Sequence, residues 1–174
     1  GDEAGTAITT GLYNTALGAS SLSSETQGSR STALGFNALL SQNFASATNA
    51  YNVAVGHNAG VENTTGTNNT FIGGLAGSAN TTGGNNTASG FEALLNNTEG
   101  AYNEAVGFKS LRANTTGAYN VAVGAAALFS NTTASYNVAV GHDSLKANTT
   151  GSQNAAMGYQ TLTANTTGSD NIAV

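Results

Sequence analysis

A glycine recurs with a 17-residue period along almost the whole chain. The interval between these glycines is 17 in every case but one, where it is 21. They are Gly18, Gly35, Gly56, Gly73, Gly90, Gly107, Gly124, Gly141 and Gly158. With Gly1 in the same phase, ten 17-residue units and one four-residue insertion account for the whole chain of 174 residues. The sequence therefore predicts one continuous repeat domain over residues 1–174.

The repeated unit predicts short strands. Its consensus is G-x-x-A-L-x-x-N-T-T-G-x-Y-N-V-A-V, and residues 107–123 match it almost throughout. The Tyr-Asn-Val-Ala-Val run is typical of a strand, and Asn-Thr-Thr-Gly is typical of a turn. Two-helix repeats need more than about 30 residues, and glycine recurs here too often for helices. We therefore predict an all-β fold: a parallel β-solenoid (β-roll or β-helix) of ten 17-residue coils, one with a four-residue insertion.

Strand alternation predicts which side chains fill the coil. We expect the large residue before each glycine to lie in the core, together with the leucine that follows four positions after the glycine. The first column is Leu17, Leu34, Val55, Ile72, Ser89, Val106, Val123, Val140, Met157 and Val174; the second contains Leu22, Leu39, Leu94, Leu111, Leu128, Leu145 and Leu162.

The alanine between the two valines is expected to face outward. Because this column stays small, we expect it to pack against another chain, with Ala105, Ala122 and Ala139 as candidate interface residues. In one unit Phe71 replaces this alanine, while Gly60 and Gly77 replace the core leucine in the adjoining units. Conservation of summed volume predicts that Phe71 fills the space near one of these glycines.

An asparagine precedes the strand run in nine of the ten units, and Ser31 stands in its place in the other. Stacked amides can donate and accept along the rod, so we expect a hydrogen-bonded ladder, with solvated turn residues as the alternative. Besides Asn14, the column is Asn52, Asn69, Asn86, Asn103, Asn120, Asn137, Asn154 and Asn171.

The Asn-Thr-Thr segments match the acceptor sequence for N-linked glycans. Turn formation is an alternative explanation of these residue types. A repeated acceptor along one edge of the rod would instead allow a sheath of glycans, attached to asparagine amides or to threonine hydroxyls. The candidate sites are Asn63, Asn80, Asn114, Asn131, Asn148, Asn165, Thr115, Thr132 and Thr149; three further matches begin at Asn68, Asn85 and Asn96.

Two other features could bind a partner. The tyrosines Tyr13, Tyr51, Tyr102, Tyr119 and Tyr136 share one column, which is either a platform for cell-surface glycans or a ladder of packed rings. The insertion falls within residues 42–49, where Phe44 is the only large apolar residue. This loop is a candidate binding tip or contact between subunits, or an insertion that the rod tolerates.

Composition excludes several classes of function. Four basic and nine acidic residues give a net charge of −5, which disfavours nucleic acid as a partner. The chain has no cysteine, and its two histidines lie five coils apart. The scattered carboxylates form no acid–base pair in a shared column. We expect no enzyme activity, no cofactor, no metal site and no insertion into a membrane.

The units resemble a family of repeats in fibrous surface proteins. Residues 114–124 and 68–77 are similar to repeats of phage tail-fibre and head-fibre proteins, and to the Asn-Ser-Val-Ala-Ile-Gly repeats in the heads of trimeric autotransporter adhesins. The adhesin repeats are shorter than the 17-residue unit of this chain. The resemblance implies a parallel β-roll or β-helix, a homotrimer, and display outside a cell or on a virion.

These observations predict a structural, non-enzymatic extracellular fibre protein, the shaft or head of a trimeric phage fibre or bacterial adhesin. The alternative is a self-assembling, glycosylated surface filament of solenoids stacked end to end. Because the repeat is in phase at residues 1 and 174, we expect a segment of a longer fibre or a subunit that stacks on copies of itself.

Overall fold

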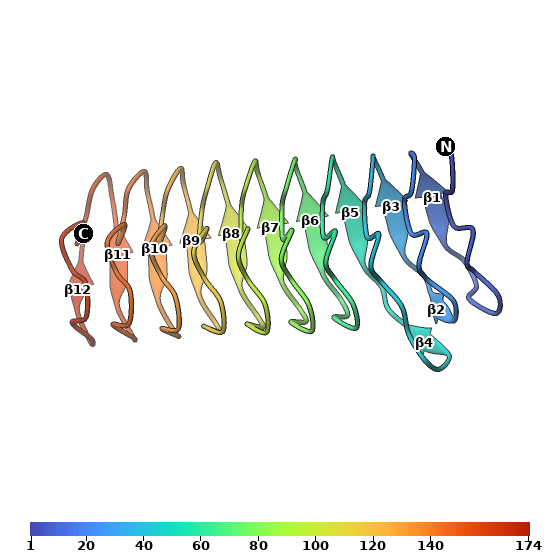
Figure 1. The fold of residues 1–174 in the computed structure, drawn as a ribbon. Coiled ribbons are helices and arrows are strands. Elements are labelled where there is room, and N and C mark those ends of the chain that lie inside the picture. Colours follow the sequence, from blue (N-terminus) through green and yellow to red (C-terminus); the bar gives the residue numbers. More distant parts are fainter.

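The computed structural model describes residues 1–174 and is a rod of stacked coils with no helix (Figure 1). Each coil contributes one short strand to a ten-stranded parallel sheet that runs the length of the rod, so the predicted β-solenoid is confirmed. The strands are β1 (Thr15–Leu17), β3 (Thr32–Leu34), β5 (Val53–Val55), β6 (Thr70–Ile72), β7 (Thr87–Ser89), β8 (Glu104–Val106), β9 (Val121–Val123), β10 (Val138–Val140), β11 (Ala155–Met157) and β12 (Ile172–Ala173).

Equivalent residues of successive coils lie in register. Val121 pairs with Val138 and Ala122 with Ala139, and the same correspondence continues along the sheet. At the anchor glycines, the glycines that begin each coil, the backbone is too crowded for a side chain. Gly124 has φ +132, and a β-carbon there would lie 2.6 Å from the carbonyl oxygen of Gly141. The regular recurrence of glycine therefore follows from both a conformation and a close approach that favour this residue.

At the strands, the side chains that face the core are the opposite set from those predicted. The strand alanines face inward and are fully buried from β3 to β11, except where Phe71 takes their place, whereas the valine column before the glycine faces outward. The predicted inward position of Leu17, Ile72 and Met157 is therefore wrong, since all three are exposed. The predicted leucine column does lie in the core, where it packs against the strand alanines and a third column of small residues. The buried leucines are Leu22, Leu39, Leu94, Leu111, Leu128 and Leu145.

The leucines adopt an unusual backbone. Leu111 and Leu128 both have φ 50, in the left-handed region that glycine favours. Two further positions of each coil also have positive φ, among them Tyr119 at 57 and Lys109 at 56. These three left-handed positions in each coil turn the chain sharply enough to close it within a single repeat.

Two asparagine ladders form the polar half of the interior. In the ladder before the strands, Asn120 Nδ2 donates to the Ala134 carbonyl at 2.9 Å and its backbone N–H donates to Asn103 Oδ1 at 3.0 Å. In the second ladder, Asn114 Nδ2 donates to Asn97 Oδ1 at 2.7 Å and to the Gly117 carbonyl at 2.9 Å. The amide groups of both ladders are buried, and their hydrogen bonds within and between coils satisfy them along the rod.

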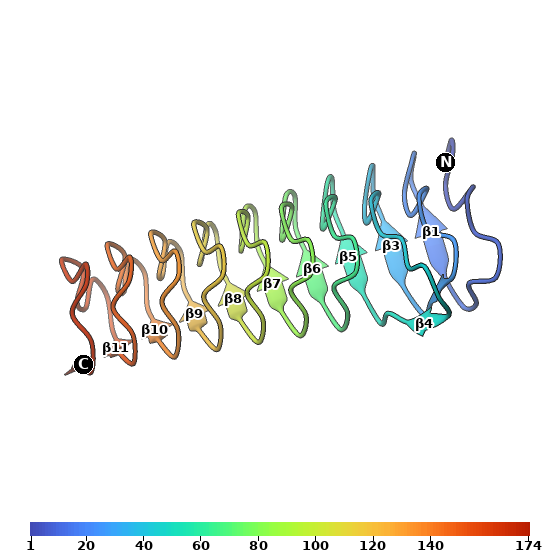
Figure 2. The ribbon, with the colours of Figure 1, turned by 60° about the horizontal axis from the view of Figure 1, so that its bottom comes forward.

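The second ladder begins only after the insertion, at Asn63. The residues of the insertion project beside β2 (Gly28–Ser29) as β4 (Thr48–Asn49) (Figure 1). The coils from β5 to β11 keep one outline (Figure 2). In the two coils before that of Asn63, Glu25 and Gln42 replace the ladder asparagines and are fully buried. Glu25 Oε1 accepts from the Gly28 N–H at 2.6 Å, and Glu25 Oε2 accepts from Gln42 Nε2 at 2.9 Å.

Phe44 and Ser31 also contact Glu25 and Gln42. The Phe44 N–H donates to Glu25 Oε1 at 3.3 Å, and a β-carbon on Gly28 would lie 2.7 Å from the Phe44 ring. Ser31 is the one residue of the first ladder that is not asparagine, and its Oγ accepts from Gln42 Nε2 at 3.0 Å. A short serine thus makes room for the longer side chains opposite it.

Candidate functional site

The outward strand face is the set of side chains that point away from the core on either side of each buried strand alanine. None of its members is buried. They are Thr15, Leu17, Thr32, Leu34, Val53, Val55, Thr70, Ile72, Thr87, Ser89, Glu104, Val106, Val121, Val123, Val138, Val140, Ala155, Met157, Ile172 and Val174. Glu104 is the only charged residue among these twenty positions, so the face is almost uniformly apolar or hydroxylated.

Aromatic columns flank this face on both sides. Two residues before each strand comes the tyrosine column, which contains Tyr102, Tyr119 and Tyr136; two residues after each strand comes the phenylalanine–histidine column, which contains Phe91 and Phe108. Sixteen large apolar side chains of the protein are exposed, and all but Leu12 belong to the outward strand face or to these columns. Exposed apolar surface is therefore gathered along the strands.

The size of this surface is that of a protein interface. Ten strands about 4.8 Å apart give a length of about 43 Å, and the six residue steps between the flanking columns give a width of about 20 Å. The resulting area is on the order of 850 Å², against about 800 Å² for each partner in a standard interface. This footprint includes threonine hydroxyls, the Asn68 and Asn85 amides and the Glu104 carboxylate, so its apolar part is smaller than the whole area.

The tyrosine column is a stacked ladder. The rings of Tyr102 and Tyr119 lie 4.9 Å apart with 3° between their planes, and those of Tyr119 and Tyr136 lie 5.1 Å apart with 2°. Further along, the Arg30 guanidinium lies 5.1 Å from the Tyr13 ring centroid and 5.7 Å from that of Tyr51. A sugar stacks on an open ring face, and both faces of Tyr119 are covered by its neighbours. The geometry favours ring packing over a sugar platform.

The phenylalanine–histidine column stacks in pairs. The Phe91 and Phe108 rings lie 5.9 Å apart at 15°, and the Phe36 and His57 rings lie 5.5 Å apart at 17°. Nothing in the sequence pattern of this column predicted its exposure beside the strands, because aromatic, histidine, glycine and alanine residues alternate in it. Its position became visible only when the strand face next to it was found to point outward.

The proposed acceptor asparagines lie inside the rod. Asn63, Asn80, Asn114, Asn131 and Asn148 are fully buried, and their amides bond within the second ladder. Asn165 is half-buried and donates to Asn148 Oδ1 and the Gly168 carbonyl. The assignment of the buried five as glycan sites is wrong for the folded chain, because a glycan on Nδ2 would need the space that the ladder fills. The exposed matches are Asn68, Asn85 and Asn96.

The first threonine of each Asn-Thr-Thr segment also has a structural role. The hydroxyls of Thr115, Thr132 and Thr149 are donors to carbonyl oxygens of the next coil, at 3.1, 3.1 and 3.0 Å. These three hydroxyls are therefore engaged. The second threonine of each pair, such as Thr116 or Thr133, is the exposed one.

The expected interface residues are not on the surface. Ala105, Ala122 and Ala139 are fully buried in the core of their own coil, and Phe44, within the insertion, is only 5% exposed. The alanines were assigned to the wrong side of the strand, so the expected contact through them is wrong. The surface available to a second chain is the outward strand face, which lies on the opposite side of the same strands.

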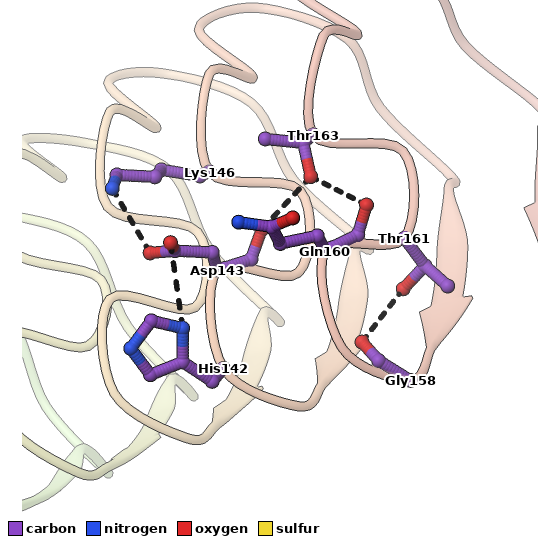
Figure 3. A network of polar contacts seen from close by, with 7 residues as sticks. All are labelled: His142, Asp143, Lys146, Gly158, Gln160, Thr161 and Thr163. Carbon is purple, nitrogen blue, oxygen red and sulfur yellow. Dashed lines mark hydrogen bonds and ion pairs between the residues drawn. The ribbon is translucent and has the colours of Figure 1, made fainter.

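The charged side chains form small local clusters. Asp143 lies 3.0 Å from Lys146 Nζ and 3.4 Å from His142 Nδ1, and nearby Thr163 bonds to backbone carbonyls (Figure 3). Arg112 Nε lies 2.6 Å from Glu92 Oε2. No group of three or more potential metal ligands and no pocket is found, and no helix could span a membrane. The Glu92 cluster pairs charges across adjoining coils, whereas the Asp143 cluster lies within one coil.

Comparisons with protein-family models, with curated proteins and with solved structures find no match to this chain.

Proposed function

We propose that this protein is a structural element of an extracellular fibre, the shaft or head of a phage fibre or a bacterial surface adhesin, and that it carries out no catalysis. The observation that supports this proposal is the unbroken stack itself. One sheet and one apolar core run from coil to coil along the rod, and two buried amide ladders join the coils from Asn52 and Asn63 onward. Such an arrangement supplies stiffness and length, which are what a fibre needs.

We propose further that three copies associate side by side through the outward strand face. The two flanking columns differ, with tyrosines on one side and phenylalanines and histidines on the other. A contact that joins the tyrosine edge of one copy to the opposite edge of the next is heterologous. Such contacts form a closed ring when the rotation from one copy to the next divides a full turn evenly. A threefold ring with parallel rods lets each copy place its tyrosine side against the opposite side of the next.

The end-to-end filament under a glycan coat receives less support. The acceptor asparagines that suggested a continuous sheath are mostly the buried ladder residues. The side-by-side trimer, in contrast, covers the large apolar surface along the strands.

The trimer is tested by the mass of the protein in solution. We expect three times 17.2 kDa by light scattering, and rods in electron micrographs. Val123 lies on the outward strand face, so Val123→Asp should yield folded monomers because it adds a charge to the apolar contact. Thr116→Asp is the matched control, since Thr116 is exposed away from the strands, and it should remain trimeric. A monomeric parent chain, or a trimer that survives Val123→Asp, would contradict the proposal.

A further inference from the structure

The outward strand face carries a single charge near the middle of the sheet. Glu104 occupies the first position of β8, where every other strand of the sheet has threonine, valine, alanine or isoleucine. Its side chain is exposed and takes part in no ion pair. In register beside it lie Thr87 of β7 and Val121 of β9.

No cation on this chain neutralises Glu104. The nearest basic residues along the chain are Lys109 and Arg112, and both pair with Glu92, at 3.8 and 2.6 Å. The other titratable groups nearby are phenols of the tyrosine column, including Tyr102 two residues earlier. The flanking columns that a docked copy also brings contain Arg30, His57 and His142, which lie four, three and two coils from β8. At the level of Glu104 itself, the docked copy therefore adds no cation.

We infer that Glu104 makes association through the outward strand face dependent on pH, with stronger association in acid. The inference rests on the proposed side-by-side trimer. Rotation about an axis parallel to the rods keeps equivalent residues at the same height, so the three Glu104 carboxylates lie at one level. Elsewhere on this face the contact is apolar or hydroxylated, and it excludes water.

Like charges brought together in a water-poor contact disfavour the ionised form, and burial disfavours it further. Assembly therefore takes up protons at Glu104. Because proton uptake accompanies association, lowering the pH from about 7.5 toward about 5 drives the equilibrium toward the trimer. At neutral pH the same residue weakens association, and so limits how readily the rods join.

The test compares association constants of the full chain by sedimentation equilibrium at pH 7.5 and pH 5. We expect the parent chain to associate about tenfold or more tightly at pH 5. Glu104→Gln should associate at pH 7.5 as tightly as the parent does at pH 5, with little further change in acid. Circular dichroism at both pH values checks that each variant keeps its fold.

Glu99→Gln is the matched control. Glu99 belongs to the same coil, is exposed, and lies on the turn away from the strands, so this change removes the same charge. It should keep the pH dependence of the parent chain. An equal loss of pH dependence in Glu99→Gln would overturn the inference, because overall charge would then explain it.

The remaining outcomes separate this inference from the proposed function. If the parent chain is trimeric with an association constant that neither pH nor Glu104→Gln changes, the inference is wrong and the trimer stands. If the parent chain and Glu104→Gln are both monomeric at both pH values, the trimer itself is refuted, and this inference falls with it.

Discussion

The ring of Phe71 occupies the space that Gly60 leaves in the core: a β-carbon on Gly60 would lie 2.7 Å from Phe71 Cδ2. Gly77, on the other side, is also in contact with this ring. Phe71 is fully buried in line with Ala54 and Ala88 of the neighbouring strands. The predicted exchange of volume is therefore confirmed, and it needs no reversal of the strand, because the alanine column already faces inward.

Phe71→Ala should destabilise the rod by about 3–5 kcal/mol, because the change leaves a cavity between two glycines. The triple change Phe71→Ala with Gly60→Leu and Gly77→Leu restores the consensus of the other coils. Leucine tolerates the backbone required, since Leu94 and Leu111 have φ 54 and 50 in the same column, against 58 and 57 at the glycines. In chemical denaturation, we expect the triple variant to regain most of the unfolding free energy that Phe71→Ala loses.

Either glycine change alone, in the presence of Phe71, should destabilise the protein by overpacking. If the loss of unfolding free energy in the triple variant equalled the sum of the three single losses, the positions would be independent, contrary to the contacts of the ring.

Asn120→Ala should cost about 2–4 kcal/mol, since it removes donors to Ala134 and Asn103 and leaves the buried Asn137 N–H without its acceptor. The control is Asn96→Ala, which changes an exposed asparagine and should shift stability by less than about 0.5 kcal/mol. Hydrogen exchange of the Asn137 amide gives a local readout. Unchanged protection there in Asn120→Ala would mean that the ladder bond is dispensable.

Glu25→Gln should loosen the insertion. Glu25 Oε1 accepts three backbone N–H groups, from Gln27, Gly28 and Phe44, while Oε2 accepts from Gln42. A neutral amide accepts hydrogen bonds more weakly than a carboxylate, and its N–H₂ group would face a donor. We therefore expect the free energy of unfolding to fall by about 1–3 kcal/mol.

Faster hydrogen exchange at Phe44 and Gly28, with little change in coils far from the insertion, is the expected signature of Glu25→Gln. The exposed Glu62 offers a control, because Glu62→Gln removes a charge outside the core. Equal effects of both variants would argue against a specific role for the Glu25 contacts.

Secretion of the chain from a host that glycosylates Asn-x-Thr sequences should yield a folded product modified only at accessible asparagines. We expect a glycan at Asn96, which is exposed on the turn away from the strands, and none at buried positions such as Asn114 and Asn131. Asn68 and Asn85 are also exposed, but they lie in the tyrosine column, where a glycan would block the side-by-side contact. Peptide mass mapping after enzymatic removal of the glycans distinguishes the two groups. A glycan on Asn114 in the folded protein would require a different placement of the second ladder.

The regular period was sufficient to predict the parallel stack, because a fixed repeat with glycine, turn and strand-type residues has few ways to satisfy its backbone. It also predicted that Asn120 and its equivalents form one column, since equal spacing places equal residues above one another. The second ladder, through Asn114, was missed as a core feature because Asn-Thr-Thr is equally typical of a solvated turn. Its signal was the persistence of asparagine at that position while the residues just before it varied.

Sequence alone thus determined the period, the strands and the columns, and the tertiary structure decided which side of each strand is inside. Hydrophobicity favours Val121 and Val123 over Ala122 for the core, but the coil is too narrow for them. The interior of the coil is already filled by leucines in the left-handed backbone conformation, such as Leu128, and by two columns of asparagine. Only a methyl group therefore fits at the strand. Phe71 enters where those leucines are replaced by glycine. The choice of face is therefore a matter of interior volume, which depends on the closed coil and not on the alternation along any one strand.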